Sequence, residues 1–364
     1  MVVGHDGIYA GGAHQALYAI RGLLKAGVEV GAIWGEDAEA DRGGFKRLKD
    51  LGIPFWVIPV HRRATISSLF AVRKVLREFK PDIVEAVKTS AQYNVLIAGW
   101  GMKFGLVFFR GISRPLDKWQ GWKYRLKKVR RVIANCHHLK GMMINDGLIP
   151  ADKIDVIPGE FDPSCSDPDR VDARGLREEL KIPTNIPIIS QLGNFAPWRG
   201  QDVTLQAAAI LAQNGMRFHL IFAGRETEKL LPLVKKLSLE KVVTLSRYRR
   251  DPERLLKESS ITVNASTGNE NLSGAILNAQ AMGVPAVITA LAGADEAVED
   301  GITGFIVPPR DPSAFAEAIG TLLQMSPAEY QKMRRASRSR ALKLFSSEER
   351  AKLRIKCYQN CLTV

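Results

Sequence analysis

Cysteine is scarce in this sequence, and its positions suggest no shared site. Four cysteines occur among 364 residues, and no two of them form a CxxC pair. This excludes a small disulfide-stabilised scaffold and suits a reducing compartment. Cys357 and Cys361 are four residues apart, and we interpret them as neighbours on one helix face rather than as metal ligands.

Long apolar runs are also absent. The most apolar stretch, Val95–Phe109, has 15 residues and is interrupted by Lys103, whereas a membrane-spanning helix needs about 20 apolar residues. The N-terminus shows no basic-then-apolar signal pattern. We therefore expect no transmembrane segment and a cytoplasmic location.

Acidic residues are too few to balance the basic ones. The 52 Lys and Arg against 38 Asp and Glu give a formal charge of +14, which predicts an anionic partner: nucleic acid, anionic lipid or a phosphorylated small molecule. The apolar share of 46% and the charged share of 25% are typical of soluble globular proteins and exclude a mainly disordered or collagen-like chain.

The chain has the length of two domains, and strand and helix patterns alternate along most of it. Short apolar runs separated by helices predict parallel sheets covered on both faces, and therefore two doubly wound α/β domains. The first strand, residues 1–4, is very short, which leaves open a clipped strand or a start downstream of the true one. The other expected strands are 28–34, 55–59, 83–86, 106–109, 132–134, 186–192, 219–223, 242–245, 261–264, 286–289 and 304–307.

A linker is predicted at residues 158–169, which contain three prolines and no helical period. Ahead of it, residues 7–14 (GIYAGGAH) follow the first strand and lead into a helix. Glycines there allow close approach of the backbone to a ligand, and the helix N-terminus favours an anion. The alternative is a tight turn without a ligand. The segment is not a GxGxxG motif, which disfavours a nicotinamide site.

Two segments of the second half are more informative. Residues 193–202 (GNFAPWRGQD) follow a buried strand and open a helix, so Arg199 is expected at the carboxyl edge of the sheet, where open α/β sheets bind ligands. Arginine can hold a diphosphate through two hydrogen bonds; the alternative is a solvated surface arginine. In residues 266–285, Glu270 precedes a helix that begins at Ser273 and Gly274, whose free amides would face a phosphate.

Residues 266–285 resemble the signature of the retaining glycosyltransferases of family 4, in which two glutamates flank seven residues ahead of an alanine-rich helix and a Gly-x-Pro turn. The resemblance extends over nearly the whole chain, and the order and spacing of its parts make it specific. The matching segments are 11–13 for the glycine loop, 158–162 for the linker, 222–224 for a strand end and 303–312 for the late Pro-x-Asp-Pro region.

The resemblance implies the GT-B fold, with two Rossmann-like doubly wound domains facing across a cleft. Residues 1–162 would form the acceptor domain, residues 163–340 the nucleotide-sugar domain, and residues 341–364 a helix packing back on the N-terminal domain. The implied activity is a hexosyltransferase-like, retaining, metal-independent transfer from a nucleotide-diphosphate sugar to a cell-surface glycan or lipid-linked acceptor, as in lipopolysaccharide or polysaccharide biosynthesis. No cofactor is implied beyond the donor substrate.

The same resemblance implies roles for individual residues. Glu270 corresponds to the first family glutamate, on the donor sugar, and Arg199 to the family lysine on the diphosphate; with Arg110 they would be catalytic through electrostatic stabilisation of the leaving group. No metal ligand is expected, and we interpret Asp167 and Asp169 as linker residues. The implied donor-binding residues are Gly12, Asn194, Arg199, Glu270, Asn271, Leu272, Ser273, Gly274 and Asn278. The implied acceptor-binding residues are Gly11, Gly12, His14 and Arg110.

Three positions depart from the family pattern. Asn194 stands where a second basic residue is usual, Asn278 replaces the glutamate that holds the ribose hydroxyls, and Arg110 stands where many members have histidine. A hydrogen bond to a charged group contributes about 1.5–3 kcal/mol against about 1 for a neutral one, so nucleotide binding is expected to be weaker or differently arranged. The alternative function is therefore a GT-B protein that binds nucleotide sugar or glycan with little or no turnover.

Positive charge is concentrated in residues 103–140, which hold eleven Lys and Arg, one acid (Asp117), and the aromatics Trp119, Trp122 and Tyr124. Basic segments with tryptophan are typical of surfaces that bind anionic lipid, so we expect peripheral attachment to the inner face of the plasma membrane. The alternative is a solvated helix face. No helix-turn-helix, zinc or RNA-binding motif is present, so nucleic acid is not expected as a partner.

Overall fold

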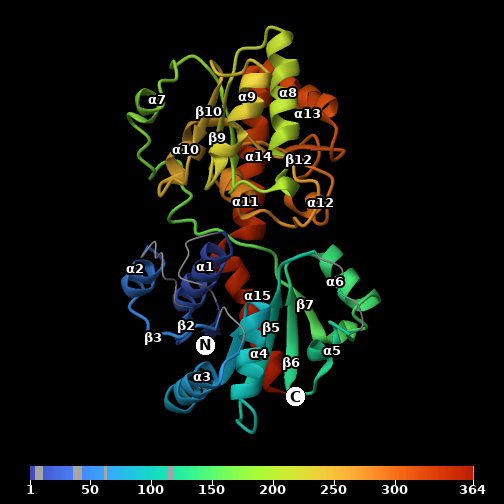
Figure 1. The fold of residues 1–364 in the computed structure, drawn as a ribbon. Helices are drawn as coiled ribbons and strands as arrows, with labels where there is room; N and C mark the ends of the chain where they lie inside the picture. The colour runs from blue at the N-terminus through green and yellow to red at the C-terminus, as the bar shows by residue number, and fades with distance from the viewer. Residues whose placement is uncertain (5–10, 36–42, 61–63, 114–115, 117–118, 364) are drawn as a thin grey trace. The chain divides into compact units, whose positions relative to one another are not determined.

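The computed structural model describes residues 1–4, 11–35, 43–60, 64–113, 116 and 119–363. The chain divides into two compact units, each built around its own sheet (Figure 1). Unit 1 comprises Met1–Asp162 and Ser346–Val364, and unit 2 comprises Pro163–Phe345.

Unit 1 contains a parallel sheet of seven strands in the order β3-β2-β1-β4-β5-β6-β7. This is the order of a doubly wound fold, extended by one strand. Its strands are β1 (Val2–Val3), β2 (Ala32–Trp34), β3 (Phe55–Val57), β4 (Ile83–Ala86), β5 (Gly105–Arg110), β6 (Val129–Ala134) and β7 (Ile154–Val156). Its helices are α1 (Gly11–Lys25), α2 (Gly43–Asp50), α3 (Ile66–Phe79), α4 (Thr89–Ala98), α5 (Trp122–Arg125), α6 (His137–Asn145) and α15 (Ser347–Leu362).

Unit 2 repeats the arrangement with six parallel strands in the order β10-β9-β8-β11-β12-β13. The prediction of two doubly wound α/β domains is thus confirmed. Its strands are β8 (Ile188–Leu192), β9 (His219–Ala223), β10 (Val243–Ser246), β11 (Ser259–Asn264), β12 (Ala286–Thr289) and β13 (Gly304–Val307). Its helices are α7 (Leu176–Glu179), α8 (Gln201–Gln213), α9 (Leu231–Lys236), α10 (Pro252–Glu258), α11 (Gly274–Ala281), α12 (Ala294–Ala297), α13 (Pro312–Gln324) and α14 (Pro327–Phe345).

Strand β7 is the element that the apolar pattern does not predict. Asp155 interrupts its run of apolar residues, but the carboxylate accepts hydrogen bonds from Arg131 of the neighbouring strand β6 at 2.8 and 2.5 Å. A cross-strand pair of opposite charges stabilises a half-exposed sheet face. The strand therefore forms although its sequence is not continuously apolar.

The last helix begins later than residue 341, the start expected from the sequence. Helix α14 continues to Phe345, and Ser346 caps the next helix, its hydroxyl accepting from the Glu349 amide. From there α15 belongs to unit 1, where it packs against α1 and β5 (Figure 1). Cys357 and Cys361 are both buried on the face of α15 that contacts the sheet, and neither forms a disulfide.

A buried ion-pair cluster ties α15 to the sheet of unit 1. Arg354 donates to Glu85 at 3.1 Å and to Glu160 at 2.8 Å, and the Tyr358 hydroxyl donates to Glu85 at 2.6 Å. Burial raises the pKa of Glu160 to about 7, against the lowering effect of Arg354. Removing one member of such a buried pair leaves an uncompensated charge, so these contacts specify where α15 docks.

Helices α1 and α15 approach each other closely at Gly22. A Cβ atom at this position would lie 2.3 Å from the Ser347 carbonyl oxygen and 2.9 Å from its carbonyl carbon. Both are backbone atoms, which cannot rotate away. Gly141, in helix α6, offers a contrast because no atom lies within 4 Å of a Cβ placed there.

We predict opposite effects for alanine at these two glycines. G22A forces α15 away from α1 and lowers the free energy of unfolding by about 1–3 kcal/mol, as overpacking of a core does. G141A increases helix propensity without a clash, so it raises the free energy of unfolding by about 0.5–1 kcal/mol. Urea denaturation of the two variants and the wild type measures both changes; equal effects would contradict this packing.

Candidate functional site

The site in unit 2 starts with the loop between β8 and α8. Gly200 ends this loop with φ 61°, and a Cβ there would lie 1.8 Å from the carbonyl oxygen of Ala265, just after β11. Only glycine accepts both the left-handed backbone and the contact. The loop is therefore pressed against the end of the neighbouring strand.

That approach brings Arg199 and Glu270 together. Arg199 Nη1 donates to Glu270 Oε2 at 3.0 Å, and the guanidinium lies 4.6 Å from the ring centroid of Trp198. The side chain of Arg199 is 27% exposed and that of Glu270 is 16% exposed, so solvent screens the interaction between their charges only partly. Burial raises the pKa of Glu270, while Arg199 and the Ser266 hydroxyl act in the opposite direction.

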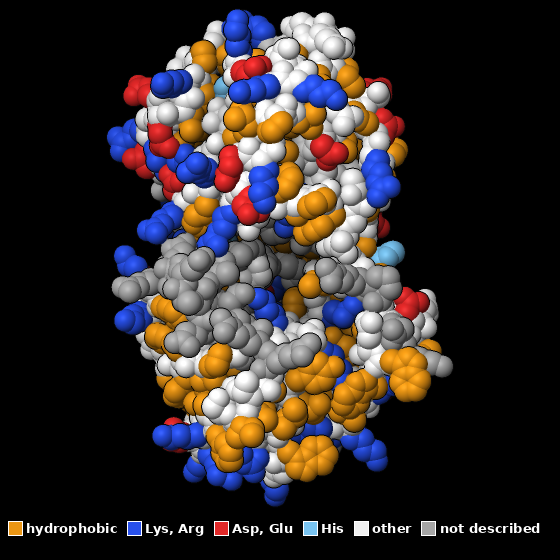
Figure 2. Space-filling model, in the orientation of Figure 1, with side chains coloured by type: hydrophobic (Ala, Val, Ile, Leu, Met, Phe, Trp, Pro, Cys, Tyr) orange, Lys and Arg blue, Asp and Glu red, His pale blue; other side chains and the backbone are white. Residues whose placement is uncertain are grey.

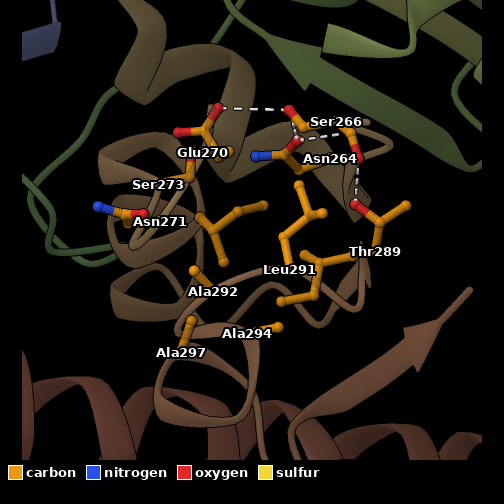
Figure 3. Close-up of a pocket in the computed structure, with 12 residues that line it drawn as sticks. Asn264, Ser266, Glu270, Asn271, Ser273, Thr289, Leu291, Ala292, Ala294 and Ala297 are labelled. Carbon is orange, nitrogen blue, oxygen red and sulfur yellow. Dashed lines mark hydrogen bonds between the residues drawn. The ribbon is translucent and has the colours of Figure 1, made fainter. Parts of the chain in front are cut away.

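Glu270 lines a pocket at the carboxyl edge of the sheet (Figure 3). Its polar wall comes from the ends of β11 and β12: the Ser266 hydroxyl lies 2.6 Å from Asn264 Oδ1 and 3.3 Å from Glu270 Oε2, and Thr289 donates to the Ser266 carbonyl at 2.6 Å. The empty space, partly open to solvent, is about 280 Å³. The apolar wall consists of Ile276, Ile288, Leu291, Ala292, Ala294 and Ala297.

Helix α11 begins beside this pocket. Ser273 is its N-cap residue but makes no side-chain capping bond, and Gly274 is its first residue. Ser273 and Asn271 line the pocket, while Leu272 is buried at 7% exposure. A helix start without a side-chain cap leaves amide N–H groups available to an anion.

Two of the expected donor-binding residues make hydrogen bonds within the protein. Asn278 donates to the Gly274 carbonyl at 2.6 Å and accepts from the buried Ser166 hydroxyl at 2.7 Å, which ties α11 to the segment entering unit 2. Asn194 Oδ1 accepts from the backbone amide of Arg225 at 3.0 Å. Both side chains thus hold neighbouring loops in place.

In the Asp-x-Asp sequence of the linker, Asp167 is likewise paired with protein groups. Asp167 pairs with Arg338 at 3.0 Å and with Arg170 at 3.4 Å. Among the residues that the structure describes, no group of three or more His, Cys, Asp or Glu side chains is arranged to hold a metal ion.

The expected acceptor residues belong to unit 1, whereas the pocket belongs to unit 2. Residues 7–10 of the glycine loop lie outside the described residues, whereas Gly11, Gly12 and His14 belong to the first turns of α1 and Arg110 ends β5. Gly12, which was expected to bind the donor as well as the acceptor, also belongs to unit 1. Burial lowers the pKa of His14 to about 3, with a smaller effect from Arg47.

The sequence did not point to several residues that shape these sites. Asn264, Ser266 and Thr289 were missed, although each stands at the carboxyl end of a strand, which is the available signal. Trp198 was missed as the platform under Arg199. The burial of Lys123 within the basic segment has no sequence signal at all, since its neighbours Trp122 and Arg125 are exposed.

Comparison with known proteins covers both units. Residues 9–164 match the family model Glycosyltransferase Family 4, and residues 186–325 match the model Glycosyl transferases group 1. The D-inositol 3-phosphate glycosyltransferase of Nocardia farcinica is 26% identical over 220 residues, 57% of this chain and 48% of that protein. The protein of the same name from Corynebacterium urealyticum is 30% identical over 204 residues, or 52% and 46%. The chain thus spans about half the length of the curated relatives it matches.

Solved structures match over nearly the full chain. A glycosyltransferase from Rickettsia africae has a TM-score of 0.86 at 19% identity, covering 99% of this chain and 98% of that one. Anabaena HepE, in complex with UDP and glucose, has a TM-score of 0.83 at 19% identity, covering 98% and 97%. WaaG, a glycosyltransferase involved in lipopolysaccharide biosynthesis, has a TM-score of 0.70 at 15% identity, covering 97% and 98%. The Rossmann-like two-domain architecture predicted from the sequence is confirmed.

We predict that the His14 imidazole stays neutral over the physiological pH range. An exposed histidine titrates near 6.5, but burial places the pKa of His14 near 3. Because the folded pKa lies below the unfolded one, the neutral ring is favoured in the folded state, and stability from this group falls as pH drops below about 6.5. Its ring NMR signals should not shift between about pH 4.5 and 8, the range in which an ordinary histidine titrates. A midpoint near 6.5 would contradict the burial.

Proposed function

The chain belongs to the family 4 (group 1) glycosyltransferases, and on that premise we propose that it transfers a sugar from a nucleotide-diphosphate sugar to a cell-surface glycan or lipid-linked acceptor. In this proposal unit 2 binds the donor and unit 1 the acceptor. Transfer proceeds with retention of the anomeric configuration and without a metal ion. Lipopolysaccharide or polysaccharide biosynthesis is the setting to which such an acceptor belongs.

The observation that carries the proposal is the contact between Arg199 and Glu270. A guanidinium and a helix N-terminus at one edge of a sheet provide positive potential for a diphosphate. Glu270 keeps Arg199 in place through its 3.0 Å hydrogen bond, and its carboxylate lines the pocket in which we propose that sugar hydroxyls bind. The pocket beside it has both polar and apolar walls, as sugar rings require.

These residues account for the proposed chemistry as follows. As the bond between sugar and diphosphate breaks, negative charge grows on the leaving nucleoside diphosphate. Arg199 and the amides that begin α11 are already aimed at that charge, so they stabilise the transition state without reorganising. Arg110 cannot act as a base because a guanidinium does not lose its proton; in unit 1 it would bind or orient the acceptor.

The comparisons support the choice of first substrates. The named curated relatives act, by name, on an inositol phosphate, and the HepE structures hold UDP with glucose or UDP-glucose. Uridine-diphosphate sugars and phosphorylated acceptors are therefore the first probes for this chain. GDP- and ADP-sugars complete the set, because the base is not specified by the residues described above.

Peripheral membrane attachment forms the second part of the proposal. Within residues 103–140, Trp119 and Trp122 are exposed at 75% and 44%, whereas Tyr124 is buried. Further exposed apolar residues of unit 1 are Ile66, Phe70, Ile97 and Trp100, and Figure 2 shows hydrophobic side chains beside Lys and Arg in this part of the chain. No described helix is long and apolar enough to cross a bilayer.

A second candidate function is binding of nucleotide sugar or glycan with little or no turnover. The side chains of Asn278 and Asn194 favour it, because the contacts they make hold loops rather than offer charge to a ligand. In that case nucleotide sugars bind, but neither transfer nor donor hydrolysis is detected.

We predict that R199M and E270Q lower kcat/KM for the preferred nucleotide sugar by about 10²–10³-fold, as loss of one electrostatic stabiliser does. A thermal-shift screen of UDP-, GDP- and ADP-sugars first identifies the donor, since a ligand at 100 times its Kd stabilises by about 2.7 kcal/mol. R174M is the matched control: Arg174 also pairs with a carboxylate in unit 2, but it is 91% exposed.

The outcomes of this experiment separate the candidates. Turnover that disappears in R199M and E270Q but survives in R174M supports the transferase. Binding without turnover in the wild type supports the second candidate. No stabilisation by any nucleotide sugar overturns both.

We predict that W119S/W122S weakens binding to anionic vesicles by about tenfold or more, because burial of one large apolar side chain contributes roughly 1.5–3 kcal/mol. Flotation with phosphatidylcholine vesicles, with and without phosphatidylserine, measures the partition coefficient at physiological salt. The control is L231S/I302S, which removes two apolar side chains of unit 2 that are 44% and 50% exposed. Equal loss in both double variants, or no preference for phosphatidylserine, would contradict membrane attachment through unit 1.

A further inference from the structure

Unit 1 contains a buried lysine that has no acidic partner among the residues that the structure describes. Lys123, on the short helix α5, is only 3% exposed. Its Nζ lies 4.6 Å from the ring centroid of Tyr93 and 5.0 Å from that of Tyr124. In the described part of the chain, no carboxylate or other hydrogen-bond acceptor contacts this ammonium group.

Three other partly buried lysines of the same unit show what is unusual about Lys123. Lys128, Lys140 and Lys153 each donate to a backbone carbonyl, at 2.6, 2.9 and 2.8 Å. Lys128 Nζ also lies 4.1 Å from the Phe104 ring centroid. It therefore resembles Lys123 in its aromatic contact and differs from it in having a hydrogen-bond acceptor. Burial of a charge is costly unless it is paired or hydrogen-bonded.

A second cation adds to the positive potential at this point. Burial, with a smaller contribution from the charge of Arg110, lowers the pKa of Lys123 to about 8. Arg110 also acts on the hydroxyl of Tyr124, the ring that lies against Lys123. Like charges that lie close together repel each other, and an anion bound by both side chains relieves that repulsion.

The surroundings hold both cations in a fixed arrangement. Arg110 ends strand β5, at the edge where open α/β sheets bind ligands, and Gln92 donates to the preceding carbonyl, that of Phe109, at 2.9 Å. The start of α5 is held by Gly121, where a Cβ would lie 2.3 Å from the Gly147 carbonyl oxygen. Tyr124 packs edge-on against Phe108 at 5.8 Å.

We propose that Lys123 and Arg110 form a binding site for the phosphate group of a phosphate ester, which the acceptor substrate carries. A phosphate offers several acceptor oxygens to an ammonium and a guanidinium at once. The identification of this ligand as the acceptor rests on the proposed function, whereas the phosphate site itself does not.

The test uses inorganic phosphate as the probe. Its affinity for the full-length protein is measured by titration against chloride at constant ionic strength, in the presence and absence of UDP. K123M keeps the side-chain stem and removes the buried charge, so it is expected to fold; circular dichroism checks this. Phosphate affinity should fall by about tenfold or more in K123M, as for loss of a hydrogen bond to a charged group. The matched control K128M should keep the wild-type affinity.

A second readout follows the lysine itself. After reductive methylation with ¹³C-formaldehyde, the Lys123 signal should titrate near pH 8 without phosphate and at higher pH with it, because a bound anion favours the charged amine. Unchanged phosphate affinity in K123M, or an unchanged Lys123 titration, overturns the proposal. Loss of the phosphate effect on adding UDP also overturns it, because the phosphate would then occupy the donor site.

A competition experiment distinguishes the sources of the phosphate ester. Displacement of inorganic phosphate by glycerol 3-phosphate but not by phosphatidylcholine vesicles containing phosphatidic acid identifies a soluble acceptor, and the reverse identifies a lipid-linked one. Displacement by neither overturns the proposal. If nucleotide sugars fail to bind while phosphate still binds at Lys123, the proposed transferase fails and the phosphate site stands.

Discussion

The parallel direction of every strand is the constraint on which the rest of this structure depends. When all strands in a sheet run the same way, the segments that follow them emerge at one edge. In unit 2, strand β11 lies next to β8 although about seventy residues separate them in the chain. The contact between Arg199 and Glu270 follows from this adjacency, and the fit of Gly200 against Ala265 fixes its distance.

Buried charge is handled in two different ways in the described part of the chain. In unit 1, Arg354 is enclosed between Glu85 and Glu160, and every charge in the cluster has an opposite neighbour. Such a cluster gives specificity of docking rather than chemistry, since its charges are satisfied within the protein. Lys123 is buried in the same unit without an acid, and Arg199 shares its acid with an open pocket. We assign anionic ligands to these two incompletely compensated charges.

Much of the fold could be predicted from the sequence because the central strands are continuous and apolar. The expected bounds of β9, β12 and β13 agree with the structure to the residue. Strand β7 could not be found in this way, since its stability depends on Arg131, which lies in a different strand. The approach of Arg199 to Glu270 could be anticipated from topology alone. The contacts of Asn278 could not, because its partner Ser166 is 112 residues away and belongs to a segment without regular structure.

The two asparagines show how a site can change while its scaffold is kept. Asn194 and Asn278 use their amides to hold the Arg225 loop and the entry segment at Ser166. A neutral amide can donate and accept at once, which a carboxylate or an ammonium group cannot do. The scaffold gains two connections. Relative to the family pattern, the carboxyl edge of the sheet loses one positive charge, at Asn194, and one negative charge, at Asn278. Arg199 and the uncapped start of α11 must therefore supply a larger share of the potential for an anion, so its binding depends more strongly on the geometry that Gly200 imposes on the Arg199 loop.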